Sequence, residues 1–271
     1  MRAIVAGCCL LLRASSLCGV ACRAGTVSLS LTDSEATFAK MPDQQRQERT
    51  GLATADLQVK GVYKELQRSD REYAVVDTRS LTIAPELLAE QMAQTVNWAY
   101  RGKHRERDDR AWTTERHLLS GIRTTAADVR DMLEVAASEG VEARALLVAQ
   151  LVDTGACVGT VHVERSADGT EAEIGMFSVD PDMQGAGIGG TLLRAAERHA
   201  ALVMGAQAAV LWVISSRADL LGWYARVGYE ATGETAPFPE DANVGVPRPG
   251  VAALEFVRLE KRLVSREGAS G

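Results

Sequence analysis

Alternating apolar and polar positions in the second half of the chain predict three consecutive strands. The segments Ala145 to Val152, Cys157 to Glu164 and Ala172 to Val179 are rich in apolar and β-branched residues. A turn at Asp153 to Gly155 joins the first two segments, and a turn at Ala167 to Gly169 joins the second and third. Because such short connections leave no room for a crossover, the three strands are expected to be antiparallel neighbours.

Helical and strand patterns alternate in the rest of the chain from residue 73 onward. Apolar stripes at helical spacing, with a capping box at Thr125 and Asp128 for the second, predict helices over 85–100, 125–138, 189–203 and 218–226. Further strands are expected at 73–78, 209–214, 229–232 and 251–259. The strand at 209–214 is continuously apolar, so it should be central and buried on both faces. This order predicts a mixed α/β domain.

The beginning of the chain has a different composition. Residues 1–32 contain three arginines but no acidic residue, and they hold four of the five cysteines. The apolar run from Ala3 to Leu12 is too short to span a bilayer as a helix. We interpret residues 1–32 as a targeting leader, either an organelle transit peptide or a secretory signal, with a leader of no consequence as the remaining alternative.

Polar composition and charge define the other boundaries. Residues 33–70, interrupted by Pro42 and Gly51, are interpreted as a linker that is either disordered or locally helical, residues 71–264 as the folded domain and residues 265–271 as a flexible tail. The chain carries 30 basic and 36 acidic residues, so removing the three leader arginines leaves 27 against 36, a net charge of −9. This balance argues against a nucleic-acid partner. Cys157 alone cannot form a disulfide framework or a Cys-rich zinc site, and His104 and His117 have no partner at metal-ligand spacing, so no metal is expected.

A glycine-rich turn between the strand ending at Val179 and the next helix carries the main chemical signal. Its residues are Gln184, Gly185, Ala186, Gly187, Ile188, Gly189 and Gly190. Glycines allow a tight bend that exposes backbone N–H groups, and a helix N-terminus attracts phosphate oxygens. The segment also matches the dinucleotide fingerprint G-x-G-x-x-G. However, Asp180 and the four residues Pro181 to Gln184 separate the strand from the first glycine, and no acidic residue ends the next strand. A purely structural turn is the other alternative.

Two motifs about 40 residues apart resemble those of the GCN5-related N-acetyltransferase (GNAT) superfamily. Gln184, Gly187 and Gly189 match its Gln/Arg-x-x-Gly-x-Gly/Ala pattern, and the segment Trp223-Tyr224 through Gly228-Tyr229 is similar to its aromatic-Tyr-x-x-x-Gly-aromatic signature. The resemblance extends over residues 73–262 and is firmest from 143 to 233. It implies the GNAT fold, an α/β architecture with a mixed central sheet of about seven strands splayed at the acyl-CoA site and flanked by about four helices.

The same resemblance implies a set of site residues. The coenzyme pyrophosphate would lie on Gln184, Gly185, Gly187, Ile188, Gly189 and Gly190, and the pantetheine arm on Phe177, Ser178 and Val179. Tyr224 is the candidate acid for the leaving thiolate and Glu173 the candidate base, with Glu171 on the same face of the strand. Trp112 and Glu115 fall in the region that forms the acceptor pocket. Each of three candidates also has a purely structural interpretation. Tyr224 would pack in the core, Glu173 would be a solvated charge at the start of a strand, and Trp112 would pack under a loop.

We therefore expect a transferase that moves an acetyl group from acetyl-CoA to a primary amine of a small molecule or peptide by direct attack. The alternative is a non-catalytic acyl-CoA-binding module with the same fold; a dinucleotide-dependent oxidoreductase is a more distant one. No membrane span is expected, and a monomer and a homodimer remain open. Because acetyl-CoA is available in organelle matrix and cytosol, a transit peptide to a plastid or mitochondrion is favoured over a cytoplasmic or secreted location.

Overall fold

The computed structural model describes residues 62–64, 72–103, 112–239 and 245–263. The predicted leader at 1–32, most of the linker at 33–70, His104 and the tail at 265–271 lie outside these residues. Within the predicted linker, Val62–Lys64 form strand β1, which pairs with the first predicted strand. These three residues belong to the central sheet, and a strand of three residues is too short to give a periodic signal in the sequence.

Eight strands form the central sheet in the order β1-β2-β4-β5-β6-β7-β10-β8. Beyond β1, they are β2 (Tyr73–Asp77), β4 (Arg144–Leu151), β5 (Cys157–Arg165), β6 (Glu171–Val179), β7 (Ala208–Ile214), β8 (Glu230–Pro237) and β10 (Glu255–Arg262). All neighbours are antiparallel except β6 and β7, which run parallel. The predicted mixed sheet is confirmed, and the apolar strand at 209–214 is an interior strand as expected.

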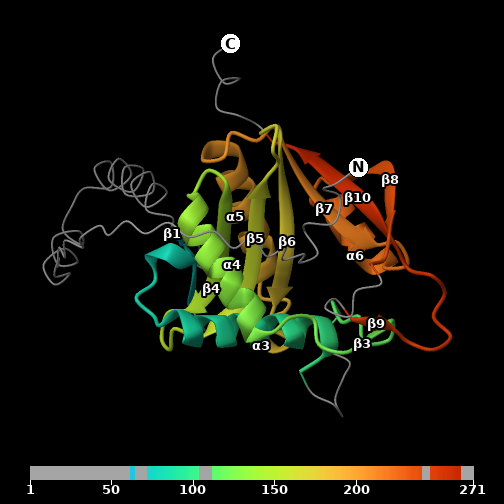
Figure 1. Ribbon diagram of the computed structural model, residues 1–271, viewed down its shortest axis with the longest axis horizontal. Helices are drawn as coiled ribbons and strands as arrows, with labels where there is room; N and C mark the ends of the chain where they lie inside the picture. Colours follow the sequence, from blue (N-terminus) through green and yellow to red (C-terminus); the bar gives the residue numbers. More distant parts are fainter. Residues whose placement is uncertain (1–61, 65–71, 104–111, 240–244, 264–271) are drawn as a thin grey trace, which may run out of the picture. The chain divides into compact units, whose positions relative to one another are not determined.

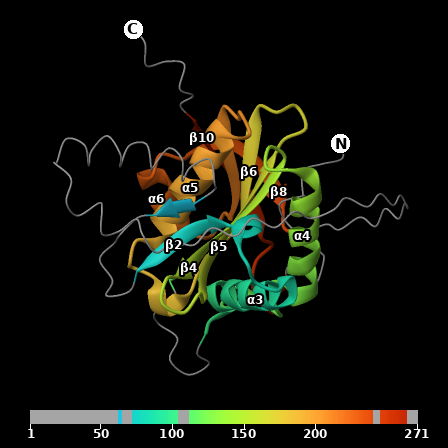
Figure 2. The same ribbon diagram turned by 90° about the vertical axis from the view of Figure 1, so that its left-hand side faces the viewer.

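Four α-helices cover the two faces of this sheet among the described residues: α3 (Pro85–Arg101), α4 (Ala126–Glu139), α5 (Ile188–Leu202) and α6 (Ala218–Arg226). Figures 1 and 2 show α3 and α4 on one face and α5 on the other. Strand alternation explains how one sheet supports two cores, since Leu147 on β4 packs with the α5 side and Leu146 with the α3 and α4 side. In the described part of the chain, no helix is both long enough and apolar enough to cross a membrane.

A local signal sets the start of α4, whereas long-range pairing sets the end of β10 and forms an additional ribbon. Helix α4 begins where Thr125 and Asp128 form the predicted capping box, with each side chain accepting a hydrogen bond from the other residue's backbone N–H. Strand β10 ends at Arg262, three residues later than expected, because β7 supplies backbone partners as far as Ala208. A two-stranded ribbon of β3 (Leu119–Ser120) and β9 (Val246–Pro247) was not predicted.

The sheet opens between β6 and β7. Their pairing covers only Glu171 to Glu173 against Ala208 to Val210, although both strands continue beyond it. A bulge on β6 accompanies the divergence: Met176 has a φ of 44°, in a region that non-glycine residues rarely adopt, and the register with β5 shifts there. The Thr160 hydroxyl donates to the Met176 carbonyl oxygen at 2.7 Å and so helps to hold the bulge.

Candidate active site

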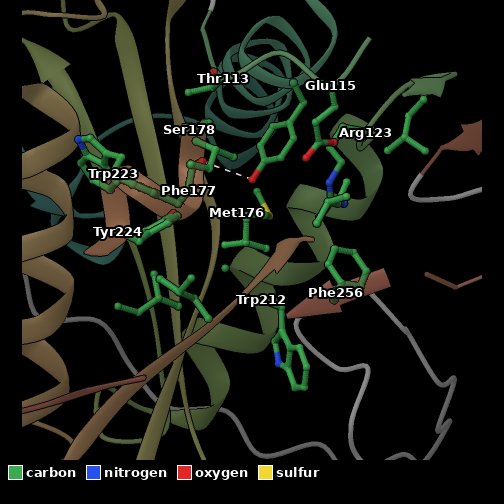
Figure 3. A pocket seen from close by; sticks show the side chains of 18 of the residues that line it. Thr113, Glu115, Arg123, Met176, Phe177, Ser178, Trp212, Trp223, Tyr224 and Phe256 are labelled. Carbon is green, nitrogen blue, oxygen red and sulfur yellow. Dashed lines mark hydrogen bonds between the residues drawn. The ribbon is translucent and has the colours of Figure 1, made fainter. Parts of the chain in front are cut away.

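A cavity of about 170 Å³ lies at the opening between β6 and β7. Its walls come from the diverging halves of β6 and β7, from α6, from residues 112–123, and from β8 and β10 with the segment between them. In Figure 3, Trp223, Tyr224 and Phe177 lie at one end of this cavity and Arg123 and Phe256 at the other. Segments that are far apart in the sequence thus share one elongated site.

The glycine turn leads directly into the N-terminus of α5. Gly185 and Gly187 both have a φ of 86°, and Gly187 is the N-cap residue, a left-handed position that glycine adopts without strain. No side chain of the described residues caps this helix, and its first backbone bond runs from Thr191 N–H to the Gly187 carbonyl at 3.1 Å. The N–H groups of Ile188 to Gly190 therefore precede the helical hydrogen-bonding ladder, and they favour an anion.

The surroundings of this turn fit a phosphate-bearing coenzyme. Gly189 is next to β6, since a Cβ at this position would lie 3.6 Å from Phe177 and 3.7 Å from Val179. A Cβ at Gly190 would meet the guanidinium of Arg194 at 3.3 Å, so a cation lies beside the first turn of the helix. Exposed backbone donors, a helix dipole and a nearby arginine are together suited to pyrophosphate oxygens.

Gln184 fixes the turn through its side chain. Its Nε2 donates to the Val179 carbonyl at 3.1 Å and to the Thr113 hydroxyl at 2.9 Å. Its Oε1 is buried and has no hydrogen-bond partner among the described residues. The side chain therefore joins the end of β6 to the segment that carries Trp112, a contact that the sequence motif alone does not reveal.

Glu173 lines the cavity at the last position of β6 that pairs with β7. Burial, together with the negative charge of Glu164 on β5, raises the pKa of its carboxyl from 4.5 to about 7, although Arg258 acts in the opposite direction. Glu164 is directly opposite Glu173 in the β5–β6 register. Glu171 is paired with Arg258 at 2.7 Å. The pKa of Glu173 therefore suits proton transfer near neutral pH.

Tyr224 lines the cavity from α6 and is 8% exposed. Its ring packs edge-on against Trp223 at 4.9 Å and against Tyr229 at 5.6 Å between centroids. Burial raises the pKa of its hydroxyl above the usual value, so the residue is a neutral O–H donor. The Tyr224 side chain therefore both packs in the core and lines the cavity.

The two residues assigned to the acceptor pocket also line the cavity. Trp112 is 43% exposed, and its ring lies 6.2 Å from that of Trp223. Glu115 is 8% exposed and forms an ion pair with Arg101 at 3.1 Å. Because Arg101 offsets its charge, Glu115 is not an isolated anion next to Trp112.

The sequence analysis did not identify three of the residues at this site. The Tyr100 hydroxyl donates to the Phe177 carbonyl at 3.3 Å (Figure 3, dashed line), and the Arg123 guanidinium lies 5.3 Å from the Tyr100 ring centroid. Tyr100 follows Ala99 of the apolar stripe and is four residues after Val96, a signal that would have placed it on the sheet side of α3. Arg123 lies in a polar loop with no such signal.

Arg217, the third of these residues, connects the start of α6 to residues 112–114, named the acceptor segment below because the resemblance assigns Trp112 to the acceptor pocket. It is only 3% exposed and donates to the carbonyl oxygens of Trp112, Thr113 and Thr114 at 2.9, 3.1 and 3.2 Å, and to Asp219 at 2.7 Å. Its partners on the acceptor segment are more than one hundred residues away in sequence, so no local pattern could have identified it.

Two further expectations concern metal and cysteine. No group of three or more His, Cys, Asp or Glu side chains within the described ranges is arranged to hold a metal ion. Cys157 is a buried free cysteine, and burial raises the pKa of its thiol to about 11, as for a core residue.

The splayed sheet, the uncapped glycine turn and the cavity between them define an α/β domain whose ligand site lies where two parallel strands diverge. Residues 106–229 match the model of the acetyltransferase (GNAT) family. This stretch of the chain is therefore a GNAT-family domain, and the resemblance inferred from its two motifs is confirmed. Comparison with curated proteins gives no match.

Several solved structures are similar to the chain. The GNAT domain of S. lividans PAT is 19% identical with a TM-score of 0.48, and the match covers 74% of this chain and 97% of that one. A GNAT-family acetyltransferase from Streptococcus pneumoniae is 15% identical with a TM-score of 0.48, covering 71% and 100%. Nourseothricin acetyltransferase is 24% identical with a TM-score of 0.37, covering 45% of this chain and 66% of that one. Sequence identities and TM-scores this low do not identify the activity of this chain.

Proposed function

We propose that this domain transfers an acetyl group from acetyl-CoA to a primary amine of a small molecule or peptide by direct attack. The observation that carries the proposal is the cavity between the diverging strands, which has a carboxylate with a pKa of about 7 in its wall and the uncapped N-terminus of α5 beside it. Membership of an acetyltransferase superfamily supports the same class of reaction.

The coenzyme would bind along the turn and the open edge of β6. The N–H groups of Ile188 to Gly190 precede the helical hydrogen-bonding ladder and can face the pyrophosphate, and Arg194 adds positive charge beside them. Beyond Glu173, the edge of β6 that faces β7 has no β7 partner. An extended pantetheine arm can therefore pair with the backbone of Phe177 to Val179 as an added strand would.

Two side chains would then handle the protons. Glu173 takes a proton from the acceptor ammonium, and the nitrogen lone pair attacks the thioester carbonyl carbon. The C–S bond breaks as the tetrahedral species collapses, and the Tyr224 hydroxyl donates its proton to the departing thiolate. The attacking nitrogen loses its second proton as it becomes the amide nitrogen, and this proton restores the Tyr224 hydroxyl. Tyr224 is suited to this role because burial keeps it protonated, and Glu173 because it is partly ionised near neutral pH.

The coenzyme site is tested by replacing Gly187 with valine. A β-branched residue at a φ of 86° costs roughly 1–2 kcal/mol and displaces the amides of the turn. We expect coenzyme A affinity to fall at least about tenfold by calorimetry. Gly155→Val is the matched control, since Gly155 has a φ of 68° in the turn after β4, away from the cavity. Wild-type affinity in the Gly187 variant, with thermal unfolding like that of the control, would contradict the site.

The catalytic proposal is tested by thiol release from acetyl-CoA across amino acids, polyamines, aminosugars and peptides. Tyr224→Phe should lower turnover far more than coenzyme affinity, and unchanged turnover would remove its role as acid. Coenzyme binding without turnover of any amine would favour the non-catalytic module instead.

For the leader we propose an organelle transit peptide. The support is compositional: residues 1–32 carry arginine without acidic residues. A reporter fused to residues 1–40 should enter a plastid or mitochondrion, and its appearance in the medium would contradict this assignment.

A further inference from the structure

His162 on β5 is a buried side chain with an unpaired ring nitrogen. It is 5% exposed, and its Nε2 has no hydrogen-bond partner within the described part of the chain. A buried polar atom without a partner lowers the stability of a fold, so the place of such an atom calls for an explanation. The proposed acetyl transfer does not use this histidine, although it lies beside the site.

The strand register places His162 next to the candidate base. His162 is directly opposite Gly175 on β6, and the next pair on the same face of the sheet is Glu164 with Glu173. His162 and Glu173 are therefore diagonal neighbours, with Cβ atoms separated by roughly 7–8 Å or less, a span that two such side chains can bridge. Gly175 lines the cavity and has no side chain, so the β6 position opposite the imidazole places nothing between the ring and the cavity wall.

The face that these residues share is covered by α3 and α4. Leu146, opposite His162 on β4, belongs to the core on this face, and Figures 1 and 2 show both helices there. Among the buried residues of the two helices only Thr95 is polar, and its hydroxyl donates to the backbone carbonyls of Gln91 and Cys157. A partner for His162 is therefore expected from the strands.

Of the polar side chains that flank His162 on this face, Glu173 is the one without a partner. The Thr160 hydroxyl donates to the Met176 carbonyl at 2.7 Å, and Arg144 forms an ion pair with Glu164 at 2.6 Å. Glu173 forms no hydrogen bond or ion pair with another described residue. One unpartnered polar group in the cavity wall and one buried behind it thus lie within reach of each other.

His162 can serve as a neutral donor. Burial, together with the positive charge of Arg144, lowers the pKa of its ring from 6.5 to about 3. A protonated imidazole beside Glu173 would lower the pKa of the carboxyl strongly and weaken it as a base. A neutral N–H can orient the carboxylate with a smaller effect on its pKa.

We infer that His162 is a positioning residue for Glu173, whose ionised carboxylate accepts a hydrogen bond from the Nε2–H of the imidazole. This inference rests on the proposed acetyl transfer, in which Glu173 takes the proton of the acceptor ammonium. A rotation of the Glu173 side chain closes the bond, and ionisation favours it because a partly buried carboxylate gains from a donor. One carboxylate oxygen is then fixed against β5, and the other faces the cavity where the ammonium arrives.

Three substitutions of His162 test this role through activity. Glutamine places an N–H near the position of Nε2, asparagine places one near Nδ1, and phenylalanine keeps a ring without a donor. His162→Phe should lower kcat roughly tenfold and raise the midpoint of the kcat/KM pH profile by roughly one pH unit, because the ionised base loses a donor. KM for acetyl-CoA should stay close to the wild-type value. His162→Gln should restore most of the activity, and His162→Asn should behave like His162→Phe.

A second buried histidine provides the matched control. His199 on α5 is 4% exposed, and its Nε2 is bonded to the Val141 carbonyl at 2.9 Å. His199→Gln should leave kcat and the pH profile unchanged, and thermal unfolding of every variant identifies loss of fold. The charged groups around the pair stay the same in all variants; they are Arg144 on β4, Glu164 on β5, Glu171 on β6, Arg258 on β10, and Glu115 and Arg123 in the cavity wall.

A spectroscopic test does not depend on turnover. In isotope-labelled protein, the NMR signal of the His162 Nε2, identified by its loss in His162→Gln, should shift with a midpoint at about pH 7 as Glu173 ionises. The ring itself should stay neutral through this transition, with its proton on Nε2. Glu173→Gln should abolish the shift, and the His199 signal should be the same in both proteins.

The outcomes separate the two proposals. A His162 signal that does not change around pH 7, or that changes equally in Glu173→Gln, overturns the inference and leaves acetyl transfer standing. A wild-type pH profile in folded His162→Phe, or an asparagine variant as active as the glutamine variant, also overturns it. Absence of turnover with every amine overturns the proposed function and the positioning role with it, even where the NMR signal shows that the two side chains are paired.

Discussion

Replacing Glu173 with glutamine should stabilise the fold above neutral pH and at the same time abolish the proposed activity. The carboxyl is held in the cavity wall, where burial and the charge of Glu164 oppose its ionisation. Glutamine has nearly the same shape and carries no charge, so it removes this unfavourable ionisation without opening a cavity. The same substitution deletes the candidate base.

The size of the effect follows from the pKa of Glu173, which is 4.5 in the unfolded reference and about 7 in the folded protein. One pKa unit corresponds to about 1.4 kcal/mol, so full expression of this difference would be about 3 kcal/mol. Because the side chain is only partly buried and still faces the cavity, we expect the substitution to raise the free energy of unfolding by roughly 1–3 kcal/mol above neutral pH.

The sign follows from proton binding. The folded state binds this proton more tightly than the unfolded state, so the stabilising contribution is complete below pH 4.5 and is lost as pH rises through about 7. The wild-type protein should therefore lose stability relative to Glu173→Gln across this interval, and the difference should be constant above it.

Denaturant unfolding at pH 5, 7 and 8.5 measures this difference directly. Glu134→Gln is the control, since Glu134 is a carboxylate on the exposed surface of α4 and should leave the pH dependence unchanged. In parallel, kcat/KM of the wild-type protein should rise with pH to a plateau above about 7, as a base with this pKa requires. A stability difference that is the same at pH 5 and 8.5 would refute the electrostatic reasoning, and retained turnover in Glu173→Gln would refute the assignment of the base.

Three other substitutions or treatments test neighbouring parts of the structure. Glu164→Gln should move the midpoint of the pH–rate profile to lower pH, because it removes a negative charge opposite Glu173; an upward shift would contradict the pairing. Arg217→Met should cost roughly 2–4 kcal/mol in chemical unfolding and raise KM for the acceptor, since three backbone carbonyls lose a buried donor; wild-type stability would show that these bonds contribute nothing. With the leader cysteines changed to serine, Cys157 should react with a thiol reagent at pH 8 only after unfolding, because the pKa of its buried thiol is about 11.

The sequence predicted those elements whose signal is local. Strands β4, β5 and β6 and helices α3 to α6 lie within about two residues of their expected bounds, since each has an internal period and a nearby turn or cap. Strand β1 and the β3–β9 ribbon are only two or three residues long. Segments this short have no period of their own, and the ribbon pairs residues more than one hundred positions apart.

The same distinction explains which parts of the site were found. The glycine turn and Tyr224 belong to contiguous motifs, and Glu173 could be placed by its spacing along β6. Arg123 and Arg217 act through residues brought together only by the fold, so a single sequence gives no reason to select them among 30 basic residues. The sequence thus predicted the residues at the glycine-turn end of the cavity better than those contributed by residues 112–123 and by the start of α6.

These long-range contacts also connect the two sides. Gln184, which is part of the glycine turn, donates to the Thr113 hydroxyl. Arg217, at the start of α6, donates to the backbone carbonyl oxygens of Trp112, Thr113 and Thr114. The acceptor segment at 112–114 is therefore held both by the glycine turn and by the start of α6, on either side of the cavity. A ligand that orders the turn also restrains this segment, so binding at one end of the cavity should be thermodynamically linked to binding at the other.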